Sequence, residues 1–451
     1  MDTAKTLAAY GLFDARVPRY TSYPPANRFA PELGQQHQRD WLTAVPADKP
    51  ISVYIHIPFC RRLCWFCACR TQGTQTLAPV AAYLADLAKE IAAVAAILPR
   101  GVGMARLHLG GGTPTLLSGP QMSRLLAQVF ATFPAAPDFE FSVEIDPTEA
   151  ADPVLAVLQD WGLHRASIGV QDFAPHVQKA IGREQSYDQT RAVIDKLRQG
   201  NLRSLNLDLI YGLPHQTHES LLRTLDQVRD LRPDRLALYG YAHVPHMSKR
   251  QVMIPDDSLP DALWRHQAIG LAQDRLRGAG YTMIGIDHFA LPDDGLARAA
   301  ASGRLRRNFQ GYTDDPCETL IGLGASAISQ FRDGFVQNAV ATAAYRARAS
   351  EEGLAGHKGA VLSPQEHFIS AVINGIMCAA SIDTQALRKA FPAMDRALTE
   401  IIDSLVARFP AAWVEVGDVW RVQPGFLPLT RVLAAAVDTA LMREDRHSIA
   451  I

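Results

Sequence analysis

The sequence lacks an excess of charge of either sign. Its 451 residues include 45 Lys and Arg against 46 Asp and Glu, which gives a formal net charge of -1 and a pI of about 6.9. A protein that binds nucleic acid or an anionic membrane through its overall field normally carries a clear positive excess. The composition therefore predicts neither nucleic acid nor a membrane as a partner.

Long apolar runs and cysteines are also scarce. No stretch reaches the roughly eighteen uninterrupted apolar residues of a membrane-spanning helix. The opening stretch MDTAKTLAAYGLFDARVPRY has charges throughout and no long apolar core, so no secretory signal is expected. Of only six cysteines, four lie within residues 60–69, which is typical of metal or redox chemistry in a reducing compartment. We expect a cytoplasmic protein.

What the sequence does contain is a repeated alternation of short β-rich runs and longer helical patterns. Helix-like stretches such as 79–98 and 218–231 separate the candidate strands. The candidate strands are 51–57, 105–110, 139–145, 165–170, 205–211 and 235–241. This alternation predicts an α/β protein with a parallel sheet of βα units, either doubly wound or rolled into a barrel.

Outside this alternation the pattern changes. Residues 1–48 show little periodicity and are interpreted as an irregular N-terminal arm, followed by the βα region over 49–355. In residues 356–451 a helical region precedes WVEVGDVWRV, a hairpin pattern whose Gly417-Asp418 pair suits a two-residue turn. We expect a mostly helical, winged-helix-like C-terminal domain.

Polar residues and glycines gather where several candidate strands end. These positions are Gly110–Thr113, Glu144, Gln171-Asp172, Asp208 and Ala242-His243. Active sites of βα barrels and open α/β sheets lie at that edge of the sheet. In the first strand Tyr54 and His56 share the polar face, so both are candidates to point toward the site. A packing tyrosine and a structural histidine explain the alternation equally well.

The cysteine-rich stretch CRRLCWFCAC occupies residues 60–69. Structural zinc sites usually combine two cysteines with a second pair a dozen or more residues away. An iron–sulfur cluster, whose several irons can take ligands from adjacent turns, fits one tight loop better. The residues alone leave open whether all four cysteines are ligands or only three.

The spacing Cys60-x3-Cys64-x2-Cys67 resembles the signature of the radical S-adenosylmethionine (SAM) enzymes. The resemblance implies that these thiolates hold a 4Fe-4S cluster whose fourth iron takes the amino and carboxylate groups of SAM. A low-potential electron donor then reduces the cluster, and SAM yields a 5′-deoxyadenosyl radical. The implied fold is a partial (β/α)6 radical SAM barrel with an N-terminal arm and a mostly helical C-terminal domain.

Two neighbouring features fit the same family. Phe66 precedes the third cysteine, where the family has an aromatic residue near the adenine of SAM. The run Gly110–Thr113 resembles the second family signature, which implies that its backbone amides meet the SAM amino group. A glycine run carries little weight alone, because any tight turn after a strand needs conformational freedom.

Ordered motifs extend the resemblance over about residues 15–335. They are RYTSYP (19–24), YIHIPFC (54–60), LHLGGGTPT (107–115), VEIDP (143–147), GVQDF (169–173), GREQ (182–185), NLDLIYGLP (206–214), YAHVP (241–245), IDHFA (286–290) and RNFQGYT (307–313). Together they resemble the oxygen-independent coproporphyrinogen III oxidases of haem biosynthesis. These enzymes convert two propionates of coproporphyrinogen III to vinyl groups, giving protoporphyrinogen IX without dioxygen. The resemblance also implies a monomer.

The resemblance further implies two SAM molecules. By motif position the first would contact Tyr54, Phe66, Gly111, Glu144 and Ile328, and the second Gly112, Thr113, Gln171, Arg183, Asp208 and Ala242. Glu144 and Asp208 can accept hydrogen bonds from ribose hydroxyls, and Arg183 can hold a carboxylate. As strand-end carboxylates, Glu144 and Asp208 could instead cap the next helix.

A substrate with four carboxylates also needs cationic partners. Candidates within the matched motifs are Arg19, Arg61, Arg62 and Arg307, with His56, His288 and Gln310 as further candidates for substrate contacts. Cys69, Tyr54 and His56 are the candidates for a direct part in catalysis.

Two positions depart from the family pattern. Ala68 stands where the family usually has glycine, and residues 377–383 read MCAASID where the oxidases commonly have Met-Cys-Asn-Phe-Arg. Two alternatives follow, a haem chaperone of a related subgroup or a radical SAM paralogue acting on another tetrapyrrole. The chaperones usually have an aromatic at the position of Cys69 and lack the RYTSYP arm, so both features favour the oxidase. Cys69 is then not a cluster ligand.

Overall fold

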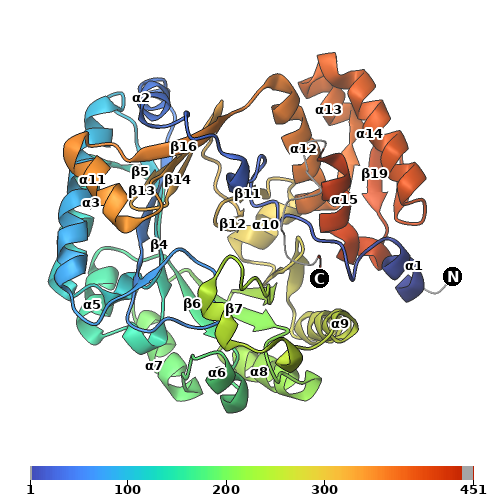
Figure 1. Cartoon of the computed structure of the whole chain (residues 1–451), viewed down its shortest axis with the longest axis horizontal. Helices are drawn as coiled ribbons and strands as arrows, with labels where there is room; N and C mark the ends of the chain where they lie inside the picture. Colours follow the sequence, from blue (N-terminus) through green and yellow to red (C-terminus); the bar gives the residue numbers. More distant parts are fainter. Residues whose placement is uncertain (1–2, 439–449, 451) are drawn as a thin grey trace.

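The computed structural model describes residues 3–438 and Ala450. Its centre is a 12-stranded sheet in which six parallel strands lie side by side in chain order (Figure 1). They are β1 (Ile51–Ile57), β4 (Met104–Gly111), β5 (Ala135–Ile145), β6 (Arg165–Gln171), β7 (Ser204–Tyr211) and β8 (Arg235–Gly240). The six strands expected from the sequence are therefore confirmed.

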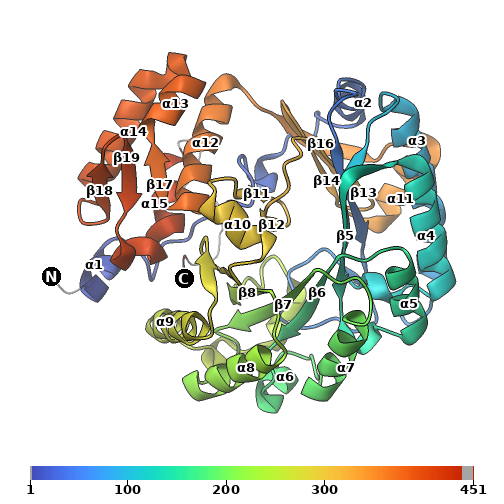
Figure 2. The ribbon, with the colours of Figure 1, turned by 180° about the vertical axis from the view of Figure 1, so that it is seen from behind.

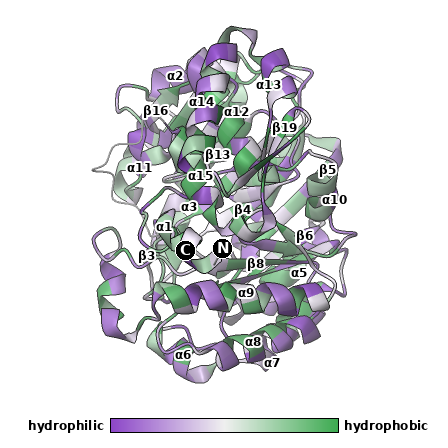
Figure 3. Ribbon diagram, turned by 90° about the vertical axis from the view of Figure 1, so that its right-hand side faces the viewer, coloured by the Kyte–Doolittle hydropathy of each residue, from purple (hydrophilic) through white to green (hydrophobic). Residues whose placement is uncertain are grey.

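Helices connect these strands and cover the outer side of the curved sheet (Figures 1 and 2). They are α3 (Ala78–Ile97), α4 (Gly119–Thr132), α5 (Asp152–Asp160), α6 (Pro175–Ala180), α7 (Tyr187–Leu197) and α8 (His218–Asp230). Capping boxes begin α4 at Ser118 and α8 at Thr217. Figure 3 shows hydrophobic and hydrophilic stretches alternating along such helices, as expected where one face covers a core.

Both edges of the sheet carry additional strands. β13 (Leu320–Leu323) returns beside β1 in parallel, and β14 (Ile328–Phe331), β15 (Gly334–Asn338) and β16 (Gly356–Val361) continue antiparallel. At the other edge β10 (His288–Ala290) and β9 (Thr282–Ile284) follow β8, also antiparallel. The sheet is an open arc, so the predicted partial (β/α)6 barrel is confirmed. β16 extends the sheet beyond residue 355.

The remaining elements of this region lie between β2 and α11. They are β2 (Phe59–Cys60), β3 (Gln72–Gly73), α9 (Ala262–Gly278), α10 (Gly295–Ala301), β11 (Arg306–Asn308), β12 (Gly311–Thr313) and α11 (Thr342–Glu351). In the described part of the chain, no helix combines the length and the apolar character needed to cross a bilayer.

The C-terminal region is a helical unit with a small sheet. Its elements are α12 (Pro364–Ala379), β17 (Ser381–Asp383), α13 (Thr384–Ala390), α14 (Asp395–Arg408), β18 (Trp413–Val416), β19 (Val419–Val422) and α15 (Thr430–Val437). The sheet order is β17-β19-β18, and Gly417 has φ +60° in the β18–β19 turn. This order of helices and strands is that of a winged helix.

The N-terminal segment is more regular than its sequence indicated. It contains α1 (Thr3–Ala9) and α2 (Gln35–Thr43). Leu7, Leu12 and Val17 are buried in the same apolar cluster as α12 and α15, and Figure 1 shows the segment running between the C-terminal unit and the barrel. Its order comes from contacts with residues distant in sequence, which leave no local periodicity.

Candidate active site

The polar residues predicted at the strand ends lie on neighbouring strands of one sheet edge. The register places Tyr54 of β1 beside His108 of β4. It also places Glu144 of β5 beside Ser167 of β6, and Asp208 of β7 beside Gly169 of β6. Since side chains alternate between the faces of a strand, these residues form one polar surface inside the arc.

Tyr54 and His56 form a hydrogen-bonded pair on this surface. The Tyr54 hydroxyl lies 2.9 Å from His56 Nδ1, and His56 Nε2 lies 3.4 Å from the Arg70 carbonyl oxygen. Because a carbonyl only accepts, we assign the ring proton to Nε2, which leaves Nδ1 to accept from Tyr54. Burial lowers the pKa of His56 and favours this neutral form. Both side chains therefore point into the site.

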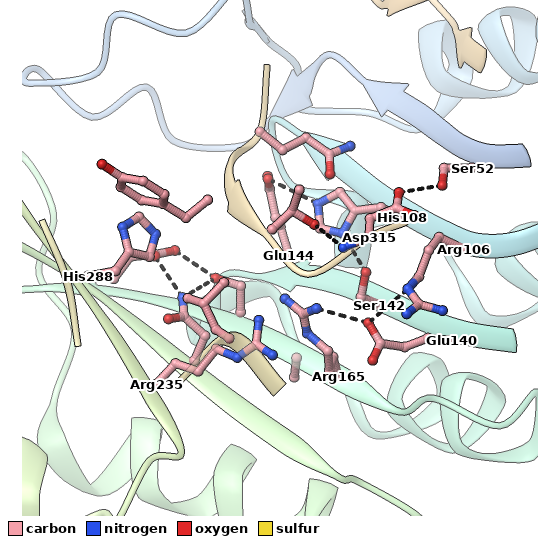
Figure 4. Close-up of a pocket in the computed structure, with 18 of the residues that line it drawn as sticks. Ser52, Arg106, His108, Glu140, Ser142, Glu144, Arg165, Arg235, His288 and Asp315 are labelled. Atoms are coloured by element: carbon pink, nitrogen blue, oxygen red, sulfur yellow. Dashed lines mark hydrogen bonds and ion pairs between the residues drawn. The ribbon is translucent and has the colours of Figure 1, made fainter. Parts of the chain in front are cut away.

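Glu144 is held as a charged carboxylate. The Gly111 N–H donates to Oε2 at 2.9 Å. His108 Nε2 lies 3.4 Å from Oε1, and both of these side chains are labelled in Figure 4. Burial pushes the pKa of Glu144 upward, but the contacts with His108 and Gly111 outweigh it and hold the pKa below its usual value. The turn after β5 is capped by Asp146, so the alternative role of Glu144 as a cap is wrong.

Asp208 has a different environment. Ser167 Oγ donates to Oδ2 and Asn206 Nδ2 donates to Oδ1, both at 2.8 Å. Burial and the nearby charge of Glu144 raise the pKa of Asp208. The next helix, α8, is capped by Thr217, so Asp208 is not a helix cap either.

The glycine run uses its amides within the protein. The Gly112 N–H donates to the Ile57 carbonyl at 2.8 Å and the Thr113 N–H to the Phe59 carbonyl at 2.9 Å, while Gly111 donates to Glu144. Gly111 has φ +113°, and a Cβ there would lie 2.6 Å from the His56 ring. The expectation that these amides bind the SAM amino group is wrong, because they are occupied and an ammonium group needs acceptors.

The four clustered cysteines lie in the loop after β1, and all are free thiols. Hydrogen bonding from Cys69, whose N–H lies 3.4 Å from Cys67 Sγ, lowers the pKa of Cys67 to about 6 despite burial. The charges of Arg250 and Arg183 act in the same direction. The interaction with Cys67 raises the pKa of Cys69. Cys67 is thus poised as a thiolate, the form that binds metals.

The donor set of this loop fits an iron–sulfur cluster. Cys60, Cys64 and Cys67 are soft ligands in one loop, and Arg183 Nη1 lies 3.5 Å from Cys64 Sγ, where it can offset thiolate charge. Within residues 3–438, no three His, Cys, Asp or Glu side chains are already gathered as a metal site. The assignment of the three ligands therefore stays a prediction.

Arg183 is fixed between two partners at the end of β6. Its Nη1 donates to Asp146 Oδ2 at 2.9 Å and its Nη2 to the Gly169 carbonyl at 2.8 Å. Its Nε is buried without a hydrogen-bond partner among the described residues. Gln171 lies nearby with φ +69°, a conformation that is costly for a residue with a side chain. One donor of Arg183 is therefore left for a ligand.

Gln251, which no sequence pattern indicated, ties the cysteine loop to the end of β8. Its Nε2 donates to the Phe66 carbonyl at 2.7 Å and to the Ala242 carbonyl at 3.1 Å. Its Oε1 accepts from the Val244 N–H at 2.5 Å, and the side chain is fully buried. Phe66 and Ala242, predicted to contact different SAM molecules, are thus linked through one side chain.

Ile328 lies on the other side of Tyr54. Gly322 of β13 is the register partner of Tyr54. A Cβ at Gly322 would lie only 2.5 Å from the Ile328 carbonyl oxygen, so the chain at Ile328 crosses directly over this glycine. Ile328 is therefore close to the strand that carries Tyr54.

A cavity with about 990 Å³ of non-atom space runs along the inside of the arc (Figure 4). Near the amino ends of the strands its charges neutralise one another: Arg165 donates to Glu140 at 2.9 Å and Arg235 to Asp294 at 2.8 Å. Near the carboxyl ends it is lined by Glu144, Asp208, Tyr239, His288 and Gln310. The cavity therefore neutralises its own charges near the amino ends of the strands, whereas near the carboxyl ends it offers mainly hydrogen-bond acceptors.

Three of the candidate substrate cations, Arg61, Arg62 and Arg307, do not line this cavity. Arg61 forms an ion pair with Glu149 at 3.0 Å, and Arg62 donates to the Glu184 carbonyl at 2.9 Å. Arg307 lies 4.1 Å over the Tyr312 ring and donates to the backbone of residues 19 and 20. The fourth candidate, Arg19, lines a second cavity, which is described below.

His108 and Asp146 are further site residues that the sequence analysis did not single out. His108 contacts Glu144, and Asp146 holds Arg183. Both lie inside recognised motifs, LHLGGGTPT and VEIDP, so a signal was present. Gln251 lies outside those motifs and is identified only by its contacts.

A parallel βα arc with a cysteine loop after its first strand defines the class of this protein. Residues 54–228 match the model of the Radical SAM superfamily. The chain is 49% identical over 450 residues to "Oxygen-independent coproporphyrinogen III oxidase" of Cereibacter sphaeroides, covering 99% of both chains. It is 47% identical to the protein of the same name from Paracoccus denitrificans, covering 100% of both.

A solved structure agrees with these sequence matches. Coproporphyrinogen III oxidase from Escherichia coli, described as a radical SAM enzyme, matches with a TM-score of 0.89 at 35% identity, over 95% of this chain and 100% of the other. This chain belongs to the oxygen-independent coproporphyrinogen III oxidase family.

Proposed function

We propose that the protein catalyses the oxygen-independent oxidative decarboxylation of two propionates of coproporphyrinogen III, giving the vinyl groups of protoporphyrinogen IX in porphyrin biosynthesis. The observation that carries the proposal is the cysteine loop beside Tyr54, Glu144 and Arg183 at the carboxyl ends of the strands. Similarity along the whole chain to oxidases of this name supports it over a haem chaperone or an enzyme for another tetrapyrrole.

Cys60, Cys64 and Cys67 are the residues that would hold the 4Fe-4S cluster. When bound, cluster and SAM together supply a 5′-deoxyadenosyl radical that removes a hydrogen atom from the substrate. The protein itself favours the ionised form of Cys67, whose pKa is lowered by the Cys69 hydrogen bond and by the charge of Arg250. The proposal includes a low-potential donor of electrons to the cluster and an acceptor for the electron that the substrate would release together with CO2.

The first SAM would be bound by Tyr54, Phe66, Gly111, Glu144 and Ile328. The charged Glu144 supports this role, because it offers an acceptor to ribose hydroxyls. In place of the glycine-run amides, we assign the SAM amino group to backbone carbonyl oxygens of this run.

The second SAM would be bound by Gly112, Thr113, Gln171, Arg183, Asp208 and Ala242. The unpaired Nε of Arg183 is a donor suited to a carboxylate. Asp208, with two donors on its own oxygens, is suited to hydroxyl groups.

Cys69, Tyr54 and His56 are the residues proposed to act directly in catalysis. Tyr54 and His56 are linked by a hydrogen bond, and the His56 ring lies against Gly111, which fixes the orientation of the pair beside the glycine run. Cys69 is exposed and its raised pKa keeps it as a thiol. A thiol next to the cluster loop has a proton or hydrogen atom available for the substrate.

The test is an anaerobic assay of the reconstituted protein with coproporphyrinogen III, SAM and a low-potential reductant. The proposal predicts protoporphyrinogen IX as product. Cleavage of SAM without protoporphyrinogen would contradict the oxidase, and stoichiometric haem binding without turnover would favour the chaperone. We further propose a monomeric, cytoplasmic enzyme with no nucleic-acid or membrane partner, which light scattering and cell fractionation would test.

A further inference from the structure

A second cavity lies outside the one described above, between the barrel and the C-terminal unit. It has about 1300 Å³ of non-atom space and is bounded by the ends of β7 and β8, by α9, by Arg19 of the N-terminal segment and by residues just before α15. Figures 1 and 2 show these segments, far apart in sequence, meeting on one side of the molecule. Ala242, which the proposed second SAM would contact, lines it, so the cavity begins at the reaction site.

One wall of this cavity is apolar. Ile269 of α9, Met283 and Ile286 of the β9 region, and Leu427 and Pro428 of the C-terminal unit line it. Such a surface suits a flat, largely hydrocarbon ligand. An apolar wall formed by three separate chain segments exists only in the folded molecule.

The same cavity is also lined by cations. They are Arg19, Arg265, Arg431 and Arg277, of which Arg277 is paired with Asp274, and Asp287 is the single carboxylate among the described lining residues. Asp287 is already engaged, since His288 Nδ1 lies 2.7 Å from its Oδ1. Arg431 is fixed by the carbonyls of Val17 and Ala450 at 2.6 and 2.9 Å.

Arg19 and Arg265 keep unused donors. Arg19 Nη2 donates a hydrogen bond to the Gly240 carbonyl at 2.8 Å. Arg265 stacks at 5.8 Å from the centroid of the Tyr211 ring, and its Nε is buried without a hydrogen bond. Neither forms an ion pair within residues 3–438, unlike Arg235 or Arg183 elsewhere in the barrel.

The electrostatics of these arginines favour an anion. Burial lowers the pKa of Arg265, and the neighbouring charge of Arg19 adds to the effect. Burial and the charge of Arg19 together lower the pKa of Arg431 to about 9. Cations that are partly desolvated and close to one another are stabilised when a carboxylate enters between them.

We infer that this cavity binds the carboxylate-bearing edge of the tetrapyrrole substrate, with Arg19 and Arg265 contacting propionates and the apolar wall contacting the macrocycle. The inference rests on the proposed function and assigns the substrate subsite within it. An ion pair stabilises a carboxylate and so opposes its loss as CO2. The two arginines therefore hold propionates that are not reacting.

The test is equilibrium binding of coproporphyrin III, the stable oxidised tetracarboxylate, to the reconstituted protein, followed by fluorescence. Arg265→Gln should weaken its binding about tenfold or more, because a charge-assisted contact is lost. Arg265→Lys keeps the charge but not the paired N–H donors of the guanidinium, so its coproporphyrin affinity should fall less. Arg19→Gln should lower the affinity as Arg265→Gln does. Arg223→Gln, an exposed α8 residue paired with Glu219, is the matched control.

SAM affinity, measured in parallel by equilibrium dialysis, separates the two carboxylate ligands. An equal loss of SAM binding in Arg265→Gln would assign the cavity to SAM and overturn the inference. Unchanged coproporphyrin affinity in Arg265→Gln and Arg19→Gln, with normal turnover, would also overturn it while the proposed function stands. A wild-type protein that neither binds coproporphyrin III nor forms protoporphyrinogen would instead refute the function itself. If Arg265→Gln loses its iron, its folding is disturbed, and the coproporphyrin affinity of Arg19→Gln then decides whether the inference holds.

Discussion

At the scale of single residues, the site depends on how each carboxylate and thiol is solvated. Glu144 and Asp208 are both partly buried strand-end acids, yet their pKa values move in opposite directions. Glu144 gains from His108 and the Gly111 N–H, whereas Asp208 has only neutral donors and faces the charge of Glu144. Environment rather than residue type therefore decides in which direction each pKa moves.

Cys69 offers the sharpest residue-scale prediction. Because it donates to Cys67 and is not assigned as a ligand, Cys69→Ser should leave iron and acid-labile sulfide content unchanged and lower turnover at least about tenfold. Cys60→Ser should instead lose the cluster. Cys378→Ser, a partly buried thiol of α12, is the matched control and should behave as wild type. Loss of iron in Cys69→Ser equal to that in Cys60→Ser would contradict the assignment of Cys60, Cys64 and Cys67 as the ligands, with Cys69 outside the cluster.

At the scale of elements, Glu90 joins α3 to the returning edge of the sheet. Its carboxylate accepts from the Gly324 N–H, Asn338 Nδ2 and the Tyr345 hydroxyl at 2.8, 2.6 and 2.7 Å. Burial raises its pKa from 4.5 to about 7 in spite of these donors. Strand β15 and helix α11 are thus held to α3 by one buried acid.

This raised pKa predicts a pH dependence of stability. Between about pH 4.5 and pH 7 folded Glu90 keeps a proton that the unfolded chain has released, so stability falls as pH rises through this window. At about 1.4 kcal/mol per pH unit, the loss approaches about 3 kcal/mol above pH 7. Urea unfolding at about pH 5 and pH 8 should show a smaller difference for Glu90→Gln than for wild type. Glu32→Gln, on an exposed residue, is the control, and parallel profiles would exclude Glu90 as the cause.

Gln251 links two other elements, the cysteine loop and the segment after β8. Gln251→Ala leaves three backbone groups without their partner, each costing about 1–3 kcal/mol. We expect faster amide hydrogen exchange in residues 60–70 and 242–254, and faster loss of iron. The control Gln199→Ala changes an exposed glutamine. Unaltered exchange in both segments would show that the loop is held by other contacts.

At the scale of the whole molecule, the N-terminal segment is held to the C-terminal unit and closes one side of the second cavity. Asp438 accepts from Arg28 Nη2 at 2.7 Å and from the Tyr20 hydroxyl at 3.1 Å, with its side chain fully buried. Arg19, next to Tyr20, contributes to the cavity wall. The position of Arg19 therefore depends on contacts across more than 400 residues of sequence.

Asp438→Asn tests this connection. Removing the charge of one member of a buried pair commonly costs about 3–5 kcal/mol, so the N-terminal segment should detach more readily. Limited proteolysis should cut within residues 1–48 several-fold faster, and the KM for coproporphyrinogen should rise. The control Asp403→Asn replaces an exposed carboxylate of α14. Unchanged cleavage rates would show that the apolar contacts of Leu7 and Leu12 suffice.

The site could be predicted only in part, and particular residues show why. The cysteine spacing and the motifs around Tyr54, Glu144 and Asp208 are local in sequence, so they can be read directly. The occupied amides of Gly111, Gly112 and Thr113 depend on strand partners and were misjudged. Gln251 and the wall formed by Arg19 and Arg265 depend on contacts between distant segments.

The sequence by itself determined the alternation of strands and helices, the cysteine loop and the family. These features arise from side-chain periodicity and short spacings, which are properties of neighbouring residues. Only the tertiary structure decided in which direction the pKa of each strand-end acid moves, how the N-terminal segment is ordered, and that arginines and apolar residues meet in one cavity beside the proposed second SAM. Burial and long-range contacts set these properties, because desolvation and charge pairing depend on which residues folding brings together.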